Sequence, residues 1–165
     1  MTTAAKTSTT QVYRVYIKAT PQAIWDAITQ PEWNERFGYP GRMEYDLRPG
    51  GTFRAVAPPD AQAMGMPETI ADGEVLEADP PRRLVQTWRF LYEPLMAEGF
   101  NRLTWDIEED DGGVTRLTVT HELENAPNTA EQVTSTARLH EGGGGWALIL
   151  SDLKTLVETG SAFAG

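Results

Sequence analysis

The chain of 165 residues has no cysteine and only two histidines. The absence of cysteine excludes a disulfide framework and catalysis by a thiolate. A zinc site would have to recruit carboxylates, because two histidines alone do not fill a tetrahedral site and no ligand motif is present. We therefore expect neither a metal nor another cofactor.

Basic residues are also scarce, with 14 Lys and Arg against 24 Asp and Glu and a net charge of -10. Nucleic acids and anionic membranes attract clustered positive charge, so this balance argues against both partners. No apolar run approaches the roughly 20 residues that span a bilayer, and Met1–Thr10 lacks the apolar core of a signal peptide. These absences favour a globular protein of the cytoplasm.

Motifs of nucleophilic or phosphate chemistry are missing as well. The chain has no G-x-S-x-G sequence, and Gly142–Gly145 is not followed by the Lys-Ser/Thr pair of a P-loop. These four glycines predict a tight approach of a helix start to its neighbours, or alternatively a mobile hinge that gates a pocket. The acidic run Glu108–Asp111 lies at a turn, and we expect it to be solvated. Nothing here requires catalysis.

The pattern that is present is short-period alternation of apolar and polar residues, which predicts half-buried strands. After a disordered tail at Met1–Thr10, we expect a single domain over residues 11–160. The predicted strands are Gln11–Ala19, Arg42–Leu47, Thr52–Ala57, Thr69–Ala78, Arg82–Phe90, Asn101–Glu108 and Val114–His121.

Turn and helix signals lie between these strands. Thr20-Pro21 predicts the start of a helix, and Pro31 opens a second short one. Pro58–Pro67 is predicted to be a loop, whose Met64 and Met66 either cover a pocket as a flap or belong to an irregular surface loop. Asn128 and Glu131 form a possible capping pair, which predicts a helix over residues 129–139.

The longest periodic stretch is Gly142–Gly160. Its apolar residues recur every three or four positions, which predicts one apolar stripe on an α-helix: Trp146, Ile149, Leu150, Leu153, Leu156 and Val157. Asp152 falls off this stripe. Sequential strands joined by short turns form an antiparallel sheet, and one face of that sheet must be covered. The fold class is therefore α+β, with about seven curved strands wrapped around a long C-terminal helix and two short helices after the first strand.

Several segments resemble one known superfamily in their order and spacing. The matching segments are Ala19–Ile28, Asp46–Phe53, Gly73–Glu77, Pro80–Trp88, Leu117–His121, Gly145-Trp146, Leu150 and Leu153-Lys154. The chain resembles the START or helix-grip superfamily, also called SRPBCC or pollen-allergen-like. Within it, the chain is similar to the branch of the activator of the heat-shock-protein-90 ATPase. The resemblance implies the helix-grip fold and an internal cavity between sheet and helix.

Strand parity collects large rings on the inner face of this sheet. The residues that we expect to bind a ligand are Tyr45, Phe53, Gln86, Trp88, Trp105, His121, Trp146 and Leu150. Rings of this size on a curved sheet favour a pocket of apolar walls with few polar groups. The alternative is a filled core.

His121 is the sharpest polar candidate, since it ends the last strand at an inward position. An imidazole there either binds a polar group or moves a proton, unless it is a core histidine whose nitrogens are hydrogen-bonded. Gln86 either contacts the ligand or reaches water at a strand end. His140 is expected at the surface.

Three functions follow from these observations. The first is a binding protein for a small apolar or aromatic ligand. The second is a cyclase or dehydratase of the polyketide type, as some relatives are, with His121 as its base. The third is a co-chaperone-like interaction domain, which the resemblance implies, although the second domain of such co-chaperones is not found in these residues. Strand edges could pair two copies into a homodimer.

Overall fold

The computed structural model describes residues 10–39, 41–141 and 143–164. Within these residues one antiparallel sheet of seven strands has the order β1-β7-β6-β5-β4-β3-β2. The strands are β1 (Thr10–Ile17), β2 (Arg42–Tyr45), β3 (Thr52–Val56), β4 (Thr69–Asp79), β5 (Arg83–Phe90), β6 (Asn101–Glu109) and β7 (Thr115–Glu122). The last six form a meander, and β1 joins the sheet beside β7. The predicted sheet is confirmed.

The helices are α1 (Pro21–Thr29), α2 (Pro31–Asn34), α3 (Pro59–Ala63), α4 (Pro127–Val133) and α5 (Gly145–Thr159). Short 3-10 turns lie at η1 (Met96–Glu98), η2 (Asp111–Gly113) and η3 (Leu139–Glu141). Thr20 caps α1 by accepting a hydrogen bond from the Ala23 N–H at 3.2 Å, and Pro21 occupies the first turn. The two short helices after the first strand are therefore confirmed.

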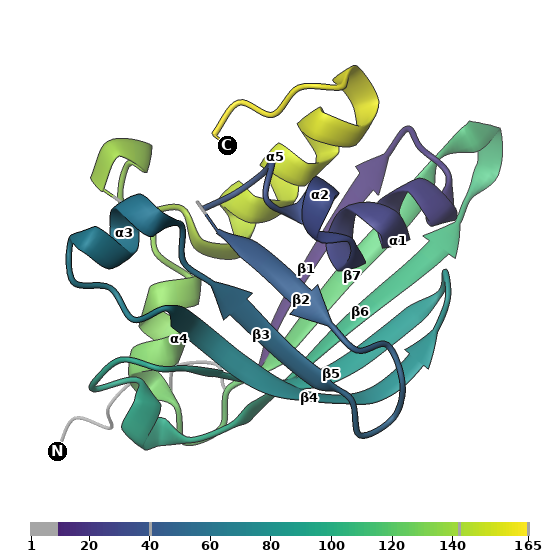
Figure 1. Ribbon diagram of the computed structural model, residues 1–165. Coiled ribbons are helices and arrows are strands. Elements are labelled where there is room, and N and C mark those ends of the chain that lie inside the picture. The colour runs from purple at the N-terminus through teal and green to yellow at the C-terminus, as the bar shows by residue number, and fades with distance from the viewer. Residues whose placement is uncertain (1–9, 40, 142, 165) are drawn as a thin grey trace, which may run out of the picture.

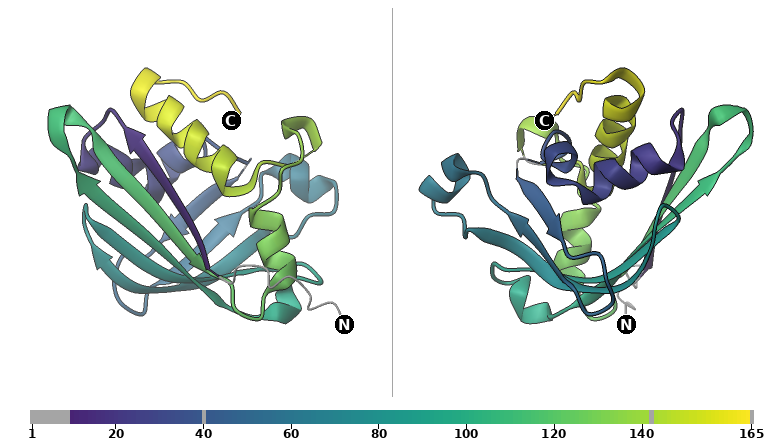
Figure 2. Two further views of the ribbon diagram at one scale, coloured as in Figure 1. Left: turned by 180° about the vertical axis from the view of Figure 1, so that it is seen from behind. Right: turned by 45° about the vertical axis from the view of Figure 1, so that its right-hand side comes forward.

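The sheet is curved, and α5, α1 and α2 lie on its concave side (Figures 1 and 2). Register places residues of β5, β6 and β7 side by side on this inner face; one row is Leu84, Trp105 and Val119. All three are at most 1% exposed. Leu150, Leu153 and Leu156 of α5 complete the core. This is the predicted α+β helix-grip arrangement.

One residue of α5 differs from its expected position. Asp152 was predicted to lie off the buried stripe, yet it is 0% exposed. Its carboxylate accepts N–H groups from Gly38 at 2.8 Å and from Phe163 and Ala164 at 2.6 and 3.2 Å. The chain after α5 folds back over this position, so backbone donors replace the water that an acidic side chain normally keeps.

Some predicted element boundaries also differ from those in the structure. Strand β2 ends at Tyr45 because a tight turn, with an N–H of Arg48 bonded to the carbonyl of Asp46, begins directly afterwards. As a result Leu47, the last residue of the predicted strand Arg42–Leu47, lies outside β2 and is 38% exposed. The predicted loop Pro58–Pro67 contains α3, which has Pro59 in its first turn and alanines after it.

The predicted helix over residues 129–139 is shorter and begins earlier. Helix α4 starts at Pro127, a favoured first position, and ends at Val133 before a run of Thr and Ser. Asn128 does not cap it. Instead, Glu98 of η1 accepts the N–H groups of Asn128 and Thr129, each at 2.8 Å. A carboxylate distant in sequence thus replaces the local cap.

Candidate functional site

The polar residues of the inner face lie on β5, β6 and β7. In the sheet register Gln86 is beside Leu103, which is beside His121, and Trp88 is beside Asn101. Gln86 and His121 are 0% exposed, and Asn101 is 8% exposed. Gln86 therefore does not reach water, which excludes that alternative. Four polar or indole-bearing side chains share one buried area of the sheet.

His121 has hydrogen-bond partners on both ring nitrogens. The indole N–H of Trp146 donates to His121 Nδ1 at 3.1 Å, and His121 Nε2 is hydrogen-bonded to Asn101 Oδ1. Burial lowers the pKa of His121 to about 3, so the ring is neutral at ordinary pH. Its acceptor lone pair is already used by Trp146. The environment is that of a structural imidazole that fixes its neighbours.

Gln86 has a similar role on the neighbouring strand. Its Oε1 accepts the hydroxyl of Tyr45 at 2.8 Å and the indole N–H of Trp105 at 3.2 Å. The Tyr45 side chain is partly exposed, but its hydroxyl is buried, and this burial raises the pKa of Tyr45 above its ordinary range. Both Tyr45 and Trp105 are therefore oriented by one amide oxygen.

Three buried donors in the described residues lack a hydrogen-bond partner. They are Gln86 Nε2, Trp88 Nε1 and Asn101 Nδ2. A buried donor that stays unpaired costs on the order of 1–3 kcal/mol, so three in one small area are a marked departure from ordinary protein interiors. All three belong to adjacent inner-face positions of β5 and β6.

Aromatic rings surround these donors. Phe53 lies 4.8 Å from Tyr45 and 5.0 Å from Trp88, measured between ring centroids, and the second pair is stacked. Trp146 makes edge contacts with Trp88 at 6.4 Å and Trp105 at 5.4 Å.

Gly73 on β4 lies beside Phe53 in the register. A Cβ at Gly73 would lie 1.9 Å from the Thr87 carbonyl oxygen, so only glycine fits between these strands.

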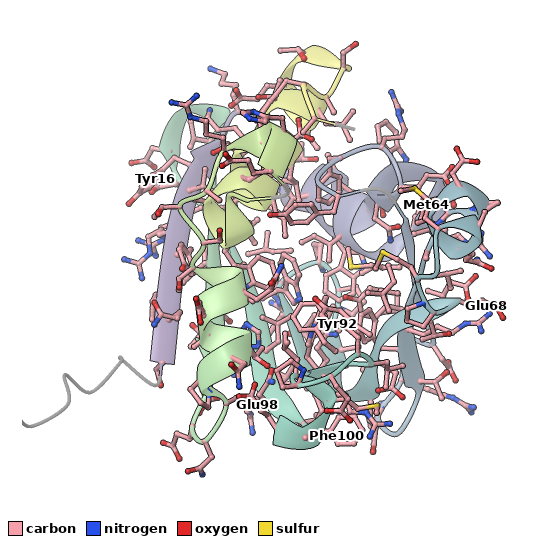
Figure 3. All side chains as sticks on the ribbon, turned by 90° about the vertical axis from the view of Figure 1, so that its left-hand side faces the viewer. Tyr16, Met64, Glu68, Tyr92, Glu98 and Phe100 are labelled. Carbon is pink, nitrogen blue, oxygen red and sulfur yellow. The ribbon has the colours of Figure 1, made fainter. Side chains whose placement is uncertain are left out.

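The inner face divides into two regions. We call the closed region the set Leu103, Trp105, Leu117, Val119 and Leu153, none of which is more than 1% exposed. We call the open region the partly exposed rings Tyr45, Trp88, Phe90 and Tyr92. Tyr92 lies near the middle of the face in Figure 3, between the helices α4 and α3. The unpaired donor of Trp88 belongs to the open region, and those of Gln86 and Asn101 adjoin it.

The structure brings the eight predicted ligand-binding residues into one neighbourhood around α5. Leu150 is 4% exposed and belongs to the core. Sequence reasoning missed Asn101, Phe90 and Tyr92 as candidates. Parity along Asn101–Leu103–Trp105 could have identified Asn101, because it continues the inner row. Tyr92 follows the end of β5, where alternation no longer applies.

Other predicted features lie apart from this area. Met64 is 87% and Met66 40% exposed, so both side chains face solvent rather than cover the rings. In the described part of the chain, two hollows of about 500 and 380 Å³ are lined by charged residues such as Asp79, Arg83 and Asp106. Neither is lined by any of the eight predicted ligand-binding residues, so the cavity between the sheet and α5 stays a prediction.

The remaining candidates are consistent with a solvated surface. His140 is exposed, as expected, and Glu108 pairs with Arg116 at 2.9 Å on the outer face. Among the described residues, no three His, Asp or Glu side chains are grouped as ligands for a metal ion. Over the same residues, every helix is too short or too polar to cross a bilayer.

Comparison with solved structures places this fold among known proteins. The chain is similar to CalU16 from Micromonospora echinospora, with 25% identity, coverage of 68% of this chain and 59% of CalU16, and a TM-score of 0.51. DynU16, from the dynemicin biosynthetic locus, has 21% identity, coverage of 96% of this chain and 51% of its own, and a TM-score of 0.68. The chain thus spans little more than half of either relative.

A third similar structure is PFC0360w, an HSP90 activator from Plasmodium falciparum. It has 20% identity, coverage of 94% of this chain and 91% of its own, and a TM-score of 0.54. No curated protein sequence matches the chain. The family model described as "Activator of Hsp90 ATPase homolog 1-like protein" matches residues 18–158, which is most of the chain. The chain therefore belongs to the family of activator of Hsp90 ATPase homolog 1-like proteins.

Proposed function

We propose that this protein binds a small apolar or aromatic ligand at the open region, beside the N-terminal end of α5. The observation that carries the proposal is the coincidence of partly exposed rings with buried donors that lack an acceptor. Binding sites for small molecules combine apolar and aromatic walls with a few polar groups that fix orientation.

Each part of the open region has a role in this proposal. The rings of Trp88, Phe90 and Tyr92 supply apolar area and stacking surface to the ligand. His121 is a positioning residue that orients Asn101 and Trp146 through its two nitrogens. Ligand atoms that reach the unpaired donors would recover the hydrogen bonds that the free protein does not make.

The two other functions have less support. A polyketide-type cyclase would need a base in this area, but the acceptor nitrogen of His121 is occupied and its pKa is lowered to about 3. Catalysis through His121 is therefore not part of the proposal. For a co-chaperone role, the likeness to the Plasmodium falciparum activator at 20% identity supports the fold alone.

The proposal is tested by titrating the protein with a panel of aromatic hydrocarbons, aromatic ketones and fatty acids while melting temperature and tryptophan fluorescence are followed. We expect a subset to raise the melting temperature and to quench fluorescence, because ligands that bind only the folded state stabilise it. A panel that changes neither signal contradicts the proposal.

A pair of variants locates the binding. Phe90→Glu places a charge in the open region at a partly exposed position, and should weaken every responding ligand at least about tenfold. Val12→Glu is the matched control, since Val12 is 56% exposed on the opposite side of the edge strand β1. If both variants bind equally well, the ligand lies elsewhere.

A further inference from the structure

We infer that the ligand is an uncharged molecule that presents a carbonyl-type hydrogen-bond acceptor to Gln86, Trp88 and Asn101. This inference rests on the proposed function and specifies the chemistry of its ligand. It follows from the direction of each hydrogen bond around the three side chains and from the charges that surround them.

The orientation of the Asn101 amide is fixed by a chain of donors. The Trp146 indole can only donate, so His121 Nδ1 must accept from it and His121 Nε2 must carry the hydrogen. Nε2 then donates to Asn101, and the atom that accepts is Oδ1. The unpaired atom of Asn101 is therefore its Nδ2, a donor, in agreement with the buried groups found without partners.

The orientation of the Gln86 amide is fixed in the same way. The Trp105 indole can only donate, so the atom of Gln86 that it contacts at 3.2 Å must be the oxygen. The same oxygen accepts the Tyr45 hydroxyl at 2.8 Å. Gln86 Nε2 is thus the atom without a partner, since rotating the amide would set its NH2 group against the Trp105 N–H and break that hydrogen bond.

The third unpaired atom, Trp88 Nε1, is a donor in every state of the side chain. Trp88 is the register partner of Asn101, and Gln86 lies two residues before Trp88 on the same face of β5. All three unsatisfied groups in this area are therefore donors, and their chemical complement is a hydrogen-bond acceptor; an oxygen with two lone pairs can pair with two of them. A ketone, quinone, ester or amide carbonyl supplies such an oxygen.

The surroundings favour a neutral acceptor over a carboxylate. Inner-face positions on β5, β6 and β7 in this area carry no Lys or Arg; they are Leu84, Gln86, Trp88, Asn101, Leu103, Trp105, Val119 and His121. His121 is held neutral by burial, which lowers its pKa to about 3. The net charge of -10 adds a field that repels anions. A buried carboxylate would thus lack a cation to compensate its charge.

Matched probes test this inference by isothermal titration calorimetry on the full chain. Two ring sizes are used, each as a ketone, a hydrocarbon and a carboxylate: acetylnaphthalene, ethylnaphthalene and naphthoate, and fluorenone, fluorene and fluorene-carboxylate. We expect each ketone to bind at least about tenfold more tightly than its hydrocarbon, because the hydrocarbon has no acceptor for the unpaired donors. We expect each carboxylate to bind more weakly than the ketone.

Two variants assign the effect to the donors. Trp88→Phe keeps an aromatic ring but removes an N–H, so it should lower the affinity for the ketones about fivefold and change that for the hydrocarbons by less than about twofold. Trp33→Phe is the control, because Trp33 lies on α2 against Arg36, outside the inner face. Equal losses in both variants contradict the assignment.

The outcomes separate the two claims. Ketones and hydrocarbons that bind equally overturn the inference and leave ligand binding itself intact. A carboxylate that binds more tightly than its ketone overturns the assignment of an uncharged ligand. If none of the six probes binds, both the inference and the proposed function are contradicted.

Discussion

The closed and open regions are made from the same strands, yet their polar groups differ in completeness. In the closed region the Trp105 N–H has an acceptor, and its ring is 1% exposed. In the open region the Trp88 N–H is buried without an acceptor, while the ring is partly exposed. Two tryptophans on neighbouring strands thus have opposite environments. The closed region thus has its indole donor paired, whereas the open region has an indole donor without an acceptor, which is the feature on which the proposed binding site rests.

The location of α5 accounts for this division. Leu150, Leu153 and Leu156 pack into the core, and Leu153 lies directly in the closed region. Trp146, in the first turn of α5, contacts Trp88 of the open region and Trp105 of the closed region. The helices on the concave side (Figure 2) leave the four rings of the open region partly exposed.

The largest contrast is expected for truncations in the two regions. Leu103→Ala removes a side chain that is 0% exposed and should lower the free energy of unfolding by about 2–5 kcal/mol. Phe90→Ala, in the open region, should cost only about 1 kcal/mol, because part of the ring already contacts water. Urea denaturation of both variants measures the difference. Equal losses would remove the distinction between the regions.

Replacing the buried Asp152 of α5 should lower the free energy of unfolding almost as much. Asp152→Asn replaces one carboxylate oxygen with an amide that cannot accept, so at least one of its backbone donors loses its partner. We expect a loss of about 2–3 kcal/mol in the free energy of unfolding. Asp60→Asn on the exposed surface of α3 is the control, and should change stability by less than about 0.5 kcal/mol. If Asp152→Asn leaves the free energy of unfolding unchanged, the carboxylate does not stabilise the fold through these backbone N–H groups.

The free energy of unfolding should depend on pH through His121, which lies between the two regions. Burial lowers the pKa of His121 to about 3, below the roughly 6.5 of an unfolded histidine. The unfolded chain therefore binds the proton first, so the stabilisation is complete above pH 6.5 and is lost as pH falls toward the folded pKa. Between pH 7 and pH 5 we expect a loss of about 2 kcal/mol.

This pH effect is isolated by comparison with His121→Gln, which has no imidazole to titrate. Carboxylates contribute equally to both proteins, so the difference between their stability curves reports His121 alone. Parallel curves over this pH range would show that the imidazole is accessible to protons in the folded protein, against its hydrogen bonds to Trp146 and Asn101.

The smallest effect concerns the two indoles themselves. Trp105→Phe breaks a hydrogen bond in the core and should cost about 2 kcal/mol. Trp88→Phe removes an unpaired donor, which offsets the lost ring area, so its stability should stay within about 1 kcal/mol of the original protein. Thermal or urea unfolding of the pair checks this order. A larger loss for Trp88→Phe would mean that its N–H is already satisfied.

Much of the fold could be predicted because local patterns and global packing agree. Alternation in Tyr13–Ile17 and Arg83–Phe90 identified strands, and the spacing of Leu150, Leu153 and Leu156 identified the terminal helix. The position of Asp152 could not be predicted, since its partners lie in Gly38 and in the chain after α5. Contacts between distant backbone segments leave no periodic signal.

The candidate site was predicted in part for the same reason. Parity placed Gln86, Trp88 and His121 on one face, because strand geometry alone determines that face. It could not show which of their hydrogen bonds are made, and it gave Asn101 no special role. The pairing of Trp88 with Asn101 depends on strand register, which arises from turns and bulges along the whole meander.

The most direct test of the account is the indole N–H spectrum of the ¹⁵N-labelled protein during titration with acetylnaphthalene, with signals assigned by single Trp→Phe variants. The Trp88 N–H has no acceptor in the free protein, whereas those of Trp105 and Trp146 do. We expect a downfield shift of the Trp88 signal on saturation, with much smaller changes at Trp105 and Trp146. A Trp88 signal that stays in place while the ligand binds would contradict it.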